Sequence, residues 1–170
     1  RDSYCADAVQ WAVANGITKG TDTTHFSPNA GCTRGQVVTF LWRAAGEPVV
    51  SGNVRFVDVA PGSYCYEAVK WAVANGITKG TDATHFSPNA GCTRGQVVTF
   101  MYRAEGEPAV GGSNGFVDVA PGSYCYEAVK WAVANGITKG TDATHFSPNA
   151  TCTRGQVVTF MYRAEGEPAV

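Results

Sequence analysis

The chain repeats itself with a period of 60 residues, and this repeat limits the folds that it can adopt. Tyr64–Val110 and Tyr124–Val170 differ at one position only, where Gly91 of the second unit is replaced by Thr151. Tyr4–Val50 is the same unit with a few substitutions. A repeat of this length is typical of supersecondary units that bury an apolar face against their neighbours. The sequence therefore predicts three tandem units that share one core.

Two short stretches rich in Gly, Ser and Asn separate the units and are typical of flexible linkers. Each precedes the motif Phe-Val-Asp-Val, at residues 56–59 and 116–119, which we expect to be extended. The motif does not occur before the first unit, so we expect the chain to be a fragment of a longer protein. The predicted organisation is one domain, with repeats at residues 1–50, 56–110 and 116–170 and linkers at residues 51–55 and 111–115.

Each unit is expected to form two helices on either side of an irregular loop. In the second unit, Ser63 is a candidate N-cap, and apolar side chains recur at helical spacing from Tyr64 to Asn75. Gly76 fits the left-handed position that ends such a helix. The run Thr-Arg-Gly-Gln at residues 93–96 has the capping-box pattern and predicts the start of the second helix, which Gly106 ends. The predicted fold class is all-α, with three tandem helix-loop-helix repeats.

Charge and apolar content exclude several functions. The chain has 13 basic and 14 acidic residues, and this balance argues against a nucleic-acid partner, which usually meets a basic excess. The longest apolar runs are far shorter than the roughly 20 residues that span a bilayer, so no membrane insertion is expected. The N-terminal residues Arg1–Ser3 do not resemble a signal peptide, and if the protein is secreted we expect its signal to have been removed.

Each unit contains two cysteines that are 27 residues apart. If the two helices begin close together, each pair closes a disulfide within its repeat, which would add about 3–4 kcal/mol to stability. One alternative is a set of reduced, buried cysteines in a cytosolic protein. Another is a metal site with His25, His85 or His145, but the spacing does not suit metal ligands. The expected disulfides are Cys5–Cys32, Cys65–Cys92 and Cys125–Cys152.

An arginine stands at the first position of the second helix in every unit. Backbone N–H groups at this end of a helix are free to bind an anion, and a guanidinium beside them completes a compact carboxylate or phosphate site. The alternative is an exposed arginine that pairs with an aspartate such as Asp58 or Asp118. The candidate anion-binding residues are Arg34, Arg94 and Arg154, with Lys19, Lys79 and Lys139 of the preceding loops as second cations.

The residues do not assemble a catalytic site. Asp22 and His25 lie three residues apart, as do their copies, but no Ser or Cys nucleophile accompanies them in an identifiable turn. We expect the histidine to lie in a surface loop and the aspartate to tie that loop by Asx-type hydrogen bonds. We therefore predict that the chain is not an enzyme and needs no cofactor.

The aromatic residues divide into core and groove candidates. The tryptophans lie on the apolar helix face and are expected in the core rather than in contact with a sugar. Tyr66 and Tyr126 are expected to be exposed and to line a groove, since the first unit has Ala6 at this position. The core and core-edge candidates are Trp11, Trp71 and Trp131, with Trp42, Tyr102 and Tyr162 near the ends of the second helices.

The order of motifs over essentially the whole chain resembles the S-layer homology repeat. In each repeat a Trp-containing helix ends in Asn-Gly-Ile-Thr-Lys-Gly-Thr and is followed by Phe-Ser-Pro-Asn and Cys-Thr-Arg-Gly-Gln. The resemblance implies a pseudo-threefold bundle whose inter-repeat grooves bind secondary cell-wall polysaccharide, often through a pyruvylated sugar. It places Arg34, Arg94 and Arg154 on the acidic group of the ligand.

This chain departs from the family motif Thr-Arg-Ala-Glu, because Gly-Gln replaces Ala-Glu. We expect the glutamines to keep the capping geometry and to alter the ligand site through the loss of a negative charge. Because Phe-Val-Asp-Val does not precede the first unit, we expect at least one groove between repeats to be incomplete. The glutamines in question are Gln36, Gln96 and Gln156.

The expected function is therefore that of a secreted, non-catalytic module that anchors a larger protein to anionic polysaccharide at the bacterial cell surface. Near-identical repeats favour multivalent binding over catalysis. The alternative is a secreted or shed adhesion fragment that binds a host or partner protein and uses the fold only as a scaffold. A third reading is a structural repeat without a ligand, which applies if the grooves are closed.

Overall fold

The computed structural model describes residues 3–170. Within this range the chain forms six α-helices, two in each repeat, and no β-strand. The all-α prediction is therefore confirmed. The helices are α1 (Ala6–Ala14), α2 (Arg34–Ala44), α3 (Tyr66–Ala74), α4 (Arg94–Ala104), α5 (Tyr126–Ala134) and α6 (Arg154–Ala164).

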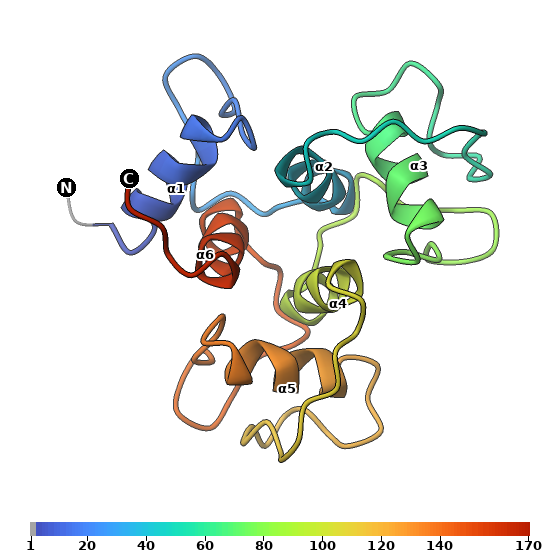
Figure 1. The fold of residues 1–170 in the computed structure, drawn as a ribbon. Helices are drawn as coiled ribbons and strands as arrows, with labels where there is room; N and C mark the ends of the chain where they lie inside the picture. The colour runs from blue at the N-terminus through green and yellow to red at the C-terminus, as the bar shows by residue number, and fades with distance from the viewer. Residues whose placement is uncertain (1–2) are drawn as a thin grey trace.

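The three repeats close into a ring. The second helices α2, α4 and α6 surround the centre, and the first helices α1, α3 and α5 lie on the outside (Figure 1). Each inner helix packs against the outer helix of the following repeat, so that α2 contacts α3 and α4 contacts α5. The last inner helix, α6, contacts α1. This arrangement is the pseudo-threefold bundle that the family resemblance implied.

Backbone hydrogen bonds around the central axis link the repeats directly. The N–H of Cys32 donates to the carbonyl of Cys152 at 2.9 Å, and the N–H of Cys152 donates to the carbonyl of Cys92 at 2.8 Å. The N–H of Cys92 donates to Cys32 at 2.9 Å and completes the cycle. Because every repeat gives and receives one of these bonds, the position of each inner helix is fixed by both of its neighbours.

We call Cys32, Cys92 and Cys152 the axial cysteines, because their backbone hydrogen bonds surround the central axis. The residue before each of them is Gly31, Gly91 or Thr151, and its surroundings explain why the second and third repeats differ at this position. A Cβ atom on Gly31 would lie 3.2 Å from Cγ2 of Thr151, and a Cβ on Gly91 would lie 3.4 Å from the same atom. One threonine therefore fits between two glycines, whereas a second side chain would crowd the axis.

The predicted disulfides within the repeats are wrong, because all six cysteines are free and buried. The two helices of a repeat do not begin side by side. The second cysteine lies on the axis, while the first lies beneath the inner helix of the preceding repeat: Sγ of Cys65 is 3.2 Å from the place of a Cβ on Gly35. Burial raises the pKa of Cys32 and Cys152 to about 12, so these thiols stay protonated.

The helix ends agree in part with the sequence prediction. The N-cap side chain of Thr93 accepts a hydrogen bond from the N–H of Gln96, whose Oε1 accepts one from the N–H of Thr93, so the capping box is confirmed. Gly76 has a positive φ of 70° after the end of α3, as expected. The N-cap at Ser63 is wrong: Cys65 is the N-cap residue of α3 and makes no side-chain capping bond.

The tryptophans lie in the core, as predicted. Trp11, Trp71 and Trp131 are all buried. The ring of Tyr162 lies 5.7 Å from that of Trp11, and the ring of Tyr102 lies 5.7 Å from that of Trp131. These contacts join the end of one inner helix to the outer helix of the next repeat, so the aromatic residues also hold the ring together.

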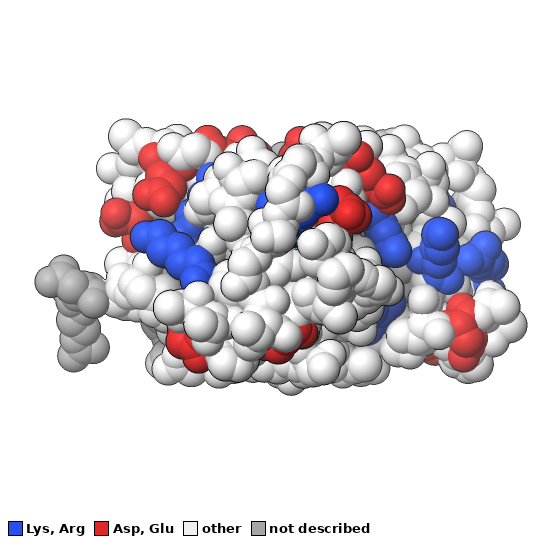
Figure 2. All heavy atoms as spheres, turned by 90° about the horizontal axis from the view of Figure 1, so that it is seen from below, with Lys and Arg blue, Asp and Glu red and all other residues white. Residues whose placement is uncertain are grey.

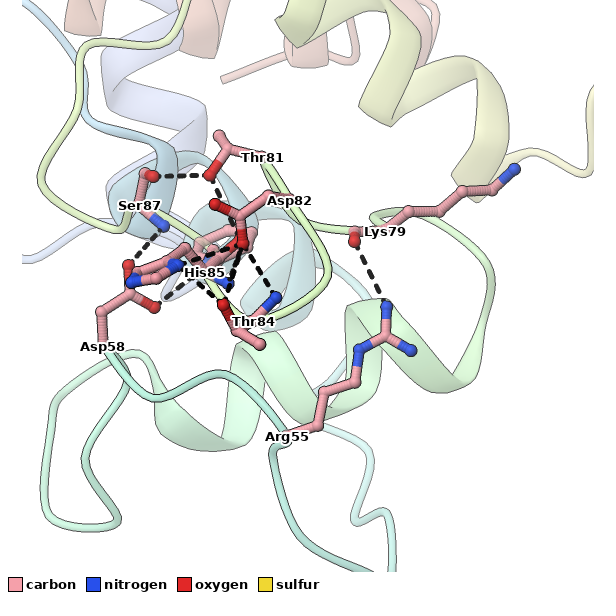
Figure 3. A network of polar contacts seen from close by, with 9 residues as sticks. Arg55, Asp58, Lys79, Thr81, Asp82, Thr84, His85 and Ser87 are labelled. Atoms are coloured by element: carbon pink, nitrogen blue, oxygen red, sulfur yellow. Dashed lines mark hydrogen bonds and ion pairs between the residues drawn. The ribbon is translucent and has the colours of Figure 1, made fainter.

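The Phe-Val-Asp-Val segments turn instead of running extended. The N–H of Val59 reaches back to the carbonyl of Phe56 at 3.4 Å, around a turn at residues 57–58. Phe56 is buried with its ring 5.9 Å from that of Phe86. The Asp58 carboxylate accepts hydrogen bonds from the N–H groups of Phe86 at 2.9 Å and Ser87 at 2.8 Å (Figure 3). The segment therefore fastens the loop of its own repeat.

The contact between α4 and α5 needs a residue without a side chain at position 95. A Cβ on Gly95 would lie 2.6 Å from Oη of Tyr124, 3.1 Å from the carbonyl of Pro148 and 3.2 Å from Sγ of Cys125. Helix propensity favours alanine over glycine by about 1 kcal/mol, but the clash opposes it.

We predict that Gly95→Ala lowers the free energy of unfolding by about 1–3 kcal/mol, measured by urea denaturation. Adding Tyr124→Phe, which removes the nearest atom, should recover part of this loss. The single Tyr124→Phe variant completes the double-mutant cycle, which gives the interaction energy between positions 95 and 124. A Gly95→Ala protein as stable as the wild type would show that the helix contact is looser than the structure indicates.

A second prediction concerns the Asp58 carboxylate. Partial burial raises its pKa, but the two backbone N–H bonds outweigh that effect and hold the pKa below its usual value. This contribution to stability is therefore present above about pH 4 and is lost as the pH falls through the folded-state pKa. Asp58→Asn should cost about 1–2 kcal/mol at pH 7, and the difference from the wild type should shrink below pH 4 in acid denaturation series. A difference that stays constant down to pH 3 would contradict this account.

Candidate ligand-binding grooves

Three cavities open between the repeats, and each contains residues from all three. The largest, of about 430 Å³, is lined by Arg34 of the first repeat, Lys79, Gln96 and Arg103 of the second, and Tyr124 of the third. The other two measure about 260 and 170 Å³. The equivalent residues are Arg94, Lys139, Gln156, Arg163 and Tyr4 in the second cavity, and Arg154, Lys19, Gln36, Arg43 and Tyr64 in the third.

We call these cavities the Arg34, Arg94 and Arg154 grooves. The structure brings every predicted Arg, Lys and Gln into one of them, but across repeats. The arginine that begins an inner helix shares its groove with the lysine and glutamine of the next repeat around the ring. No groove is missing, although the smallest is the one that holds Lys19 of the first repeat.

Each arginine that begins an inner helix is buried at the floor of its groove. Arg34 is 4% exposed, and its Nε donates a 2.9 Å hydrogen bond to the carbonyl of Phe86. The guanidinium carbon lies 4.8 Å from the ring centroid of Phe86 and 5.3 Å from that of Phe100. Burial lowers the pKa of the Arg34 guanidinium, but arginine keeps its charge in proteins. The alternative of an exposed arginine paired with Asp58 is therefore wrong.

The backbone amides at the start of the inner helices are already bonded. In α2, the N–H of Arg34 donates to the carbonyl of Ala90 at 2.9 Å, and the N–H of Gly35 donates to that of Pro88 at 2.9 Å. The N–H of Gln36 donates to the Thr33 side chain. The prediction that free helix amides bind the anion is therefore wrong. Positive charge in the groove comes from side chains alone.

Three cations line the Arg34 groove, and no carboxylate is among its lining residues. Nη1 of Arg103 donates to the carbonyl of Ile77 at 3.1 Å, which holds that arginine against the beginning of the loop. Lys79 is exposed and adds a third positive charge to the groove. Because both arginines are held by the backbone and by packing, the charge they present is preorganised.

The tyrosines of the grooves differ from those predicted. Tyr124 lines the Arg34 groove, with Oη 3.5 Å from the Thr93 hydroxyl, and burial raises its pKa, so the hydroxyl stays neutral. Tyr66 is half-buried under the linker, where its Oη accepts a hydrogen bond from the N–H of Val54 at 3.2 Å. The overlooked signal is that a tyrosine precedes the first cysteine in every unit, whereas Tyr66 has no aromatic counterpart at Ala6.

A compact network shapes the loop that carries Lys79. The Asp82 carboxylate accepts hydrogen bonds from the N–H groups of Thr84 and His85, both at 2.8 Å, and lies 3.0 Å from Nδ1 of His85 (Figure 3). The bond from Thr84, then the contact with His85, lower the pKa of Asp82 to about 2. The expected Asx-type ties are confirmed. The nearby hydroxyls of Thr81 and Ser87 bond to each other at 2.6 Å.

Charge elsewhere on the surface is mixed. Basic and acidic residues are interspersed over the face shown in Figure 2, and most of that face is uncharged. Between residues 3 and 170, no three His, Cys, Asp or Glu side chains are placed to hold a metal ion. None of the helices described is long and apolar enough to cross a membrane.

Comparison with known proteins adds to this description. The S-layer homology domain family matches the chain at residues 1–38, 55–98 and 115–158, once in each repeat. The Surface-layer 125 kDa protein of Lysinibacillus sphaericus is 34% identical over 160 residues, which is 89% of this chain and 13% of that protein. An Endoglucanase of Bacillus sp. (strain KSM-635) is 30% identical over 125 residues, which is 69% of this chain and 13% of that protein. The chain thus spans a small part of each relative, and it belongs to the S-layer homology domain family.

Proposed function

We propose that this chain is a non-catalytic module that anchors a larger protein to the bacterial cell wall by binding an anionic polysaccharide. Membership of the family and similarity to a surface-layer protein support this role. Two relatives with different names share the region over only 13% of their length, which supports a module that is joined to different proteins. The cell surface is then its place of action.

The observation that carries the proposal is the repeated basic groove. Each groove has two arginines and one lysine among its lining residues and no carboxylate. Such a site suits a carboxylate that is fixed to a sugar ring, since a guanidinium binds carboxylates with good geometry. Pyruvate held as a ketal on a sugar offers this group, and we propose it as the anionic feature of the polysaccharide.

The grooves supply distinct contacts for such a ligand. In the Arg34 groove, Nε of Arg34 is engaged by Phe86, so its Nη atoms are the donors available for the carboxylate. Lys79 at the rim adds a second cation, while the Tyr124 hydroxyl and the Gln96 amide suit sugar hydroxyls. We also propose that residues 1–50, 56–110 and 116–170 act as one binding domain, because each groove draws on all three.

Three equivalent grooves on one ring favour a polymeric ligand. A polysaccharide presents the same group many times, so occupation of one groove raises the effective concentration of ligand at the next. Catalysis gains nothing comparable from repetition. The arrangement therefore supports tethering, where slow release matters more than turnover.

A direct test is a calorimetric titration, in which purified wall polysaccharide that carries ketal-linked pyruvate is added to the chain and the heat of binding is measured. Arg34 and its equivalents hold the fold as well as the groove, so the exposed lysines are the better variants. Lys19→Gln, Lys79→Gln and Lys139→Gln combined should weaken binding at least about tenfold, since each removes a cation from a groove. Mild acid removal of pyruvate should weaken it similarly.

The matched control is Lys70→Gln combined with Lys130→Gln, which removes positive charge outside the grooves. These lysines pair with Glu67 and Glu127 on the outer helices, with an Nζ–Oε2 distance of 3.0 Å in both pairs. The control should bind like the wild type. Binding that survives both depyruvylation and the groove substitutions would contradict the proposal, as would binding to a protein partner alone.

A further inference from the structure

The three inner helices, which surround the centre of the ring, end at a cavity that lies apart from the grooves (Figure 1). They begin next to the axial cysteines, and their opposite ends line one cavity of about 170 Å³ together with residues of the three outer helices. A cavity of about 150 Å³ with apolar walls is large enough to hold a benzene molecule. No residue of this cavity lines a groove. We call it the tryptophan cavity, after Trp11, Trp71 and Trp131 in its wall.

The wall of the tryptophan cavity is aromatic and apolar. One tryptophan comes from each outer helix, so the three indole rings occupy equivalent positions in the pseudo-threefold arrangement. Tryptophan is the aromatic residue that attracts a cation most strongly, and the attraction grows where water is excluded. Buried side chains of the inner helices complete the wall: Leu41, Met101 and Met161.

The charged residues of the tryptophan cavity are all acidic. Glu105 and Glu165 are the C-cap residues of α4 and α6, and both line the cavity while remaining exposed to solvent. Ala45 stands at the same C-cap position of α2. No lysine, arginine or histidine is among the lining residues. The rim of the cavity therefore carries two negative charges that no cation of the lining balances.

The ends of the inner helices add to this negative potential. Ala44, Ala104 and Ala164 are the last residues of these helices and line the cavity, and between residues 3 and 170 their carbonyls accept no hydrogen bond. The C-terminal end of a helix carries about −0.5 of an elementary charge, and three such ends meet here. The arginines of the last turns do not offset it inside the cavity, because they line the grooves: Arg43, Arg103 and Arg163.

We propose that the tryptophan cavity is a second binding site, separate from the grooves, for a small organic cation of the quaternary ammonium class. Its methyl groups would lie against the indole rings, and its charge would be balanced by Glu105, Glu165 and the three helix ends. The proposal goes beyond the anchoring function and does not depend on it.

The chemistry of the cavity selects this class of ligand over others. An anion would meet only negative charge, and a neutral apolar molecule would gain nothing from the acidic rim. A primary ammonium group is a compact, strongly hydrated charge, so its entry into an apolar cavity is costly. A quaternary ammonium group carries its charge beneath methyl groups, has no N–H to satisfy and suits aromatic walls. A trimethylammonium group also has the threefold symmetry of the wall.

The probe is choline chloride, titrated into the full chain and followed by calorimetry against a matched titration of sodium chloride. One choline per chain is expected. The uncharged analogue of choline, in which carbon replaces the nitrogen, has the same shape and should bind at least about tenfold more weakly, because it lacks the attraction to the rings and to the acidic rim. Phosphatidylcholine vesicles distinguish the two sources of this cation: sedimentation of the chain with them assigns a lipid headgroup, and its absence assigns the free solute.

The repeats themselves supply matched variants. Glu105→Gln combined with Glu165→Gln removes both charges of the rim and should weaken choline binding about fivefold. Ala45→Glu gives the first repeat the residue that the others have at this C-cap, so the fold accommodates it, and binding should strengthen about twofold. Glu107→Gln combined with Glu167→Gln removes the same charge at exposed positions outside the lining and should leave binding nearly unchanged.

Several results would overturn the proposal. One is no binding of choline at millimolar concentration, and another is equal binding of choline and its uncharged analogue. A third is choline binding that is lost in the combined variant Lys19→Gln, Lys79→Gln and Lys139→Gln, which alters the grooves and leaves the tryptophan cavity intact. Choline binding by a chain that fails to bind wall polysaccharide would keep this inference and reject the anchoring role.

Discussion

The cyclic hydrogen bonds among Cys32, Cys92 and Cys152 are the constraint on which the rest of this structure depends. They place the start of each inner helix against the next repeat, so that the helix amides of Arg34 and Gly35 are bonded by carbonyls of the second repeat. Each groove is consequently a property of the ring and not of a repeat. A single repeat would leave these amides unbonded and its apolar faces open, which is the usual reason that such units occur in arrays.

The buried arginines join stability to binding. Arg34 is held between the rings of Phe86 and Phe100 and donates to a carbonyl of the neighbouring loop, so it ties two repeats together while its charge faces the groove. Burying an unpaired charge is costly, and the hydrogen bond and the aromatic faces offset only part of that cost. An anionic ligand would supply the missing partner. The same residue therefore couples the closure of the ring to the affinity of the groove.

Local patterns in the sequence predicted the local structure well. The capping box at Thr93, the glycine after Asn75 and the buried tryptophans each depend on residues close in the chain, and all are found. The errors concern contacts between repeats. A period of 60 residues shows that the units are alike but not which unit packs on which. The period therefore cannot predict that the second cysteines of the three repeats meet on the axis, or that carbonyls of a neighbouring repeat bond the helix amides. Ser63 is not the N-cap of α3: it lies in the preceding turn, where its N–H donates to the carbonyl of Ala60, and α3 begins after Cys65. Even Thr151 has its explanation only on the axis, where three repeats meet.

Native-state hydrogen exchange of the axial amides tests this account most directly. If closure of the ring creates the grooves, the amides of Cys32, Cys92 and Cys152 exchange only through global unfolding. Their opening free energies and denaturant dependences should then agree with one another and with those of the whole chain. Exchange of one axial amide at a distinctly lower free energy and slope would show that a repeat opens on its own, and would contradict the claim that the grooves belong to a single closed ring.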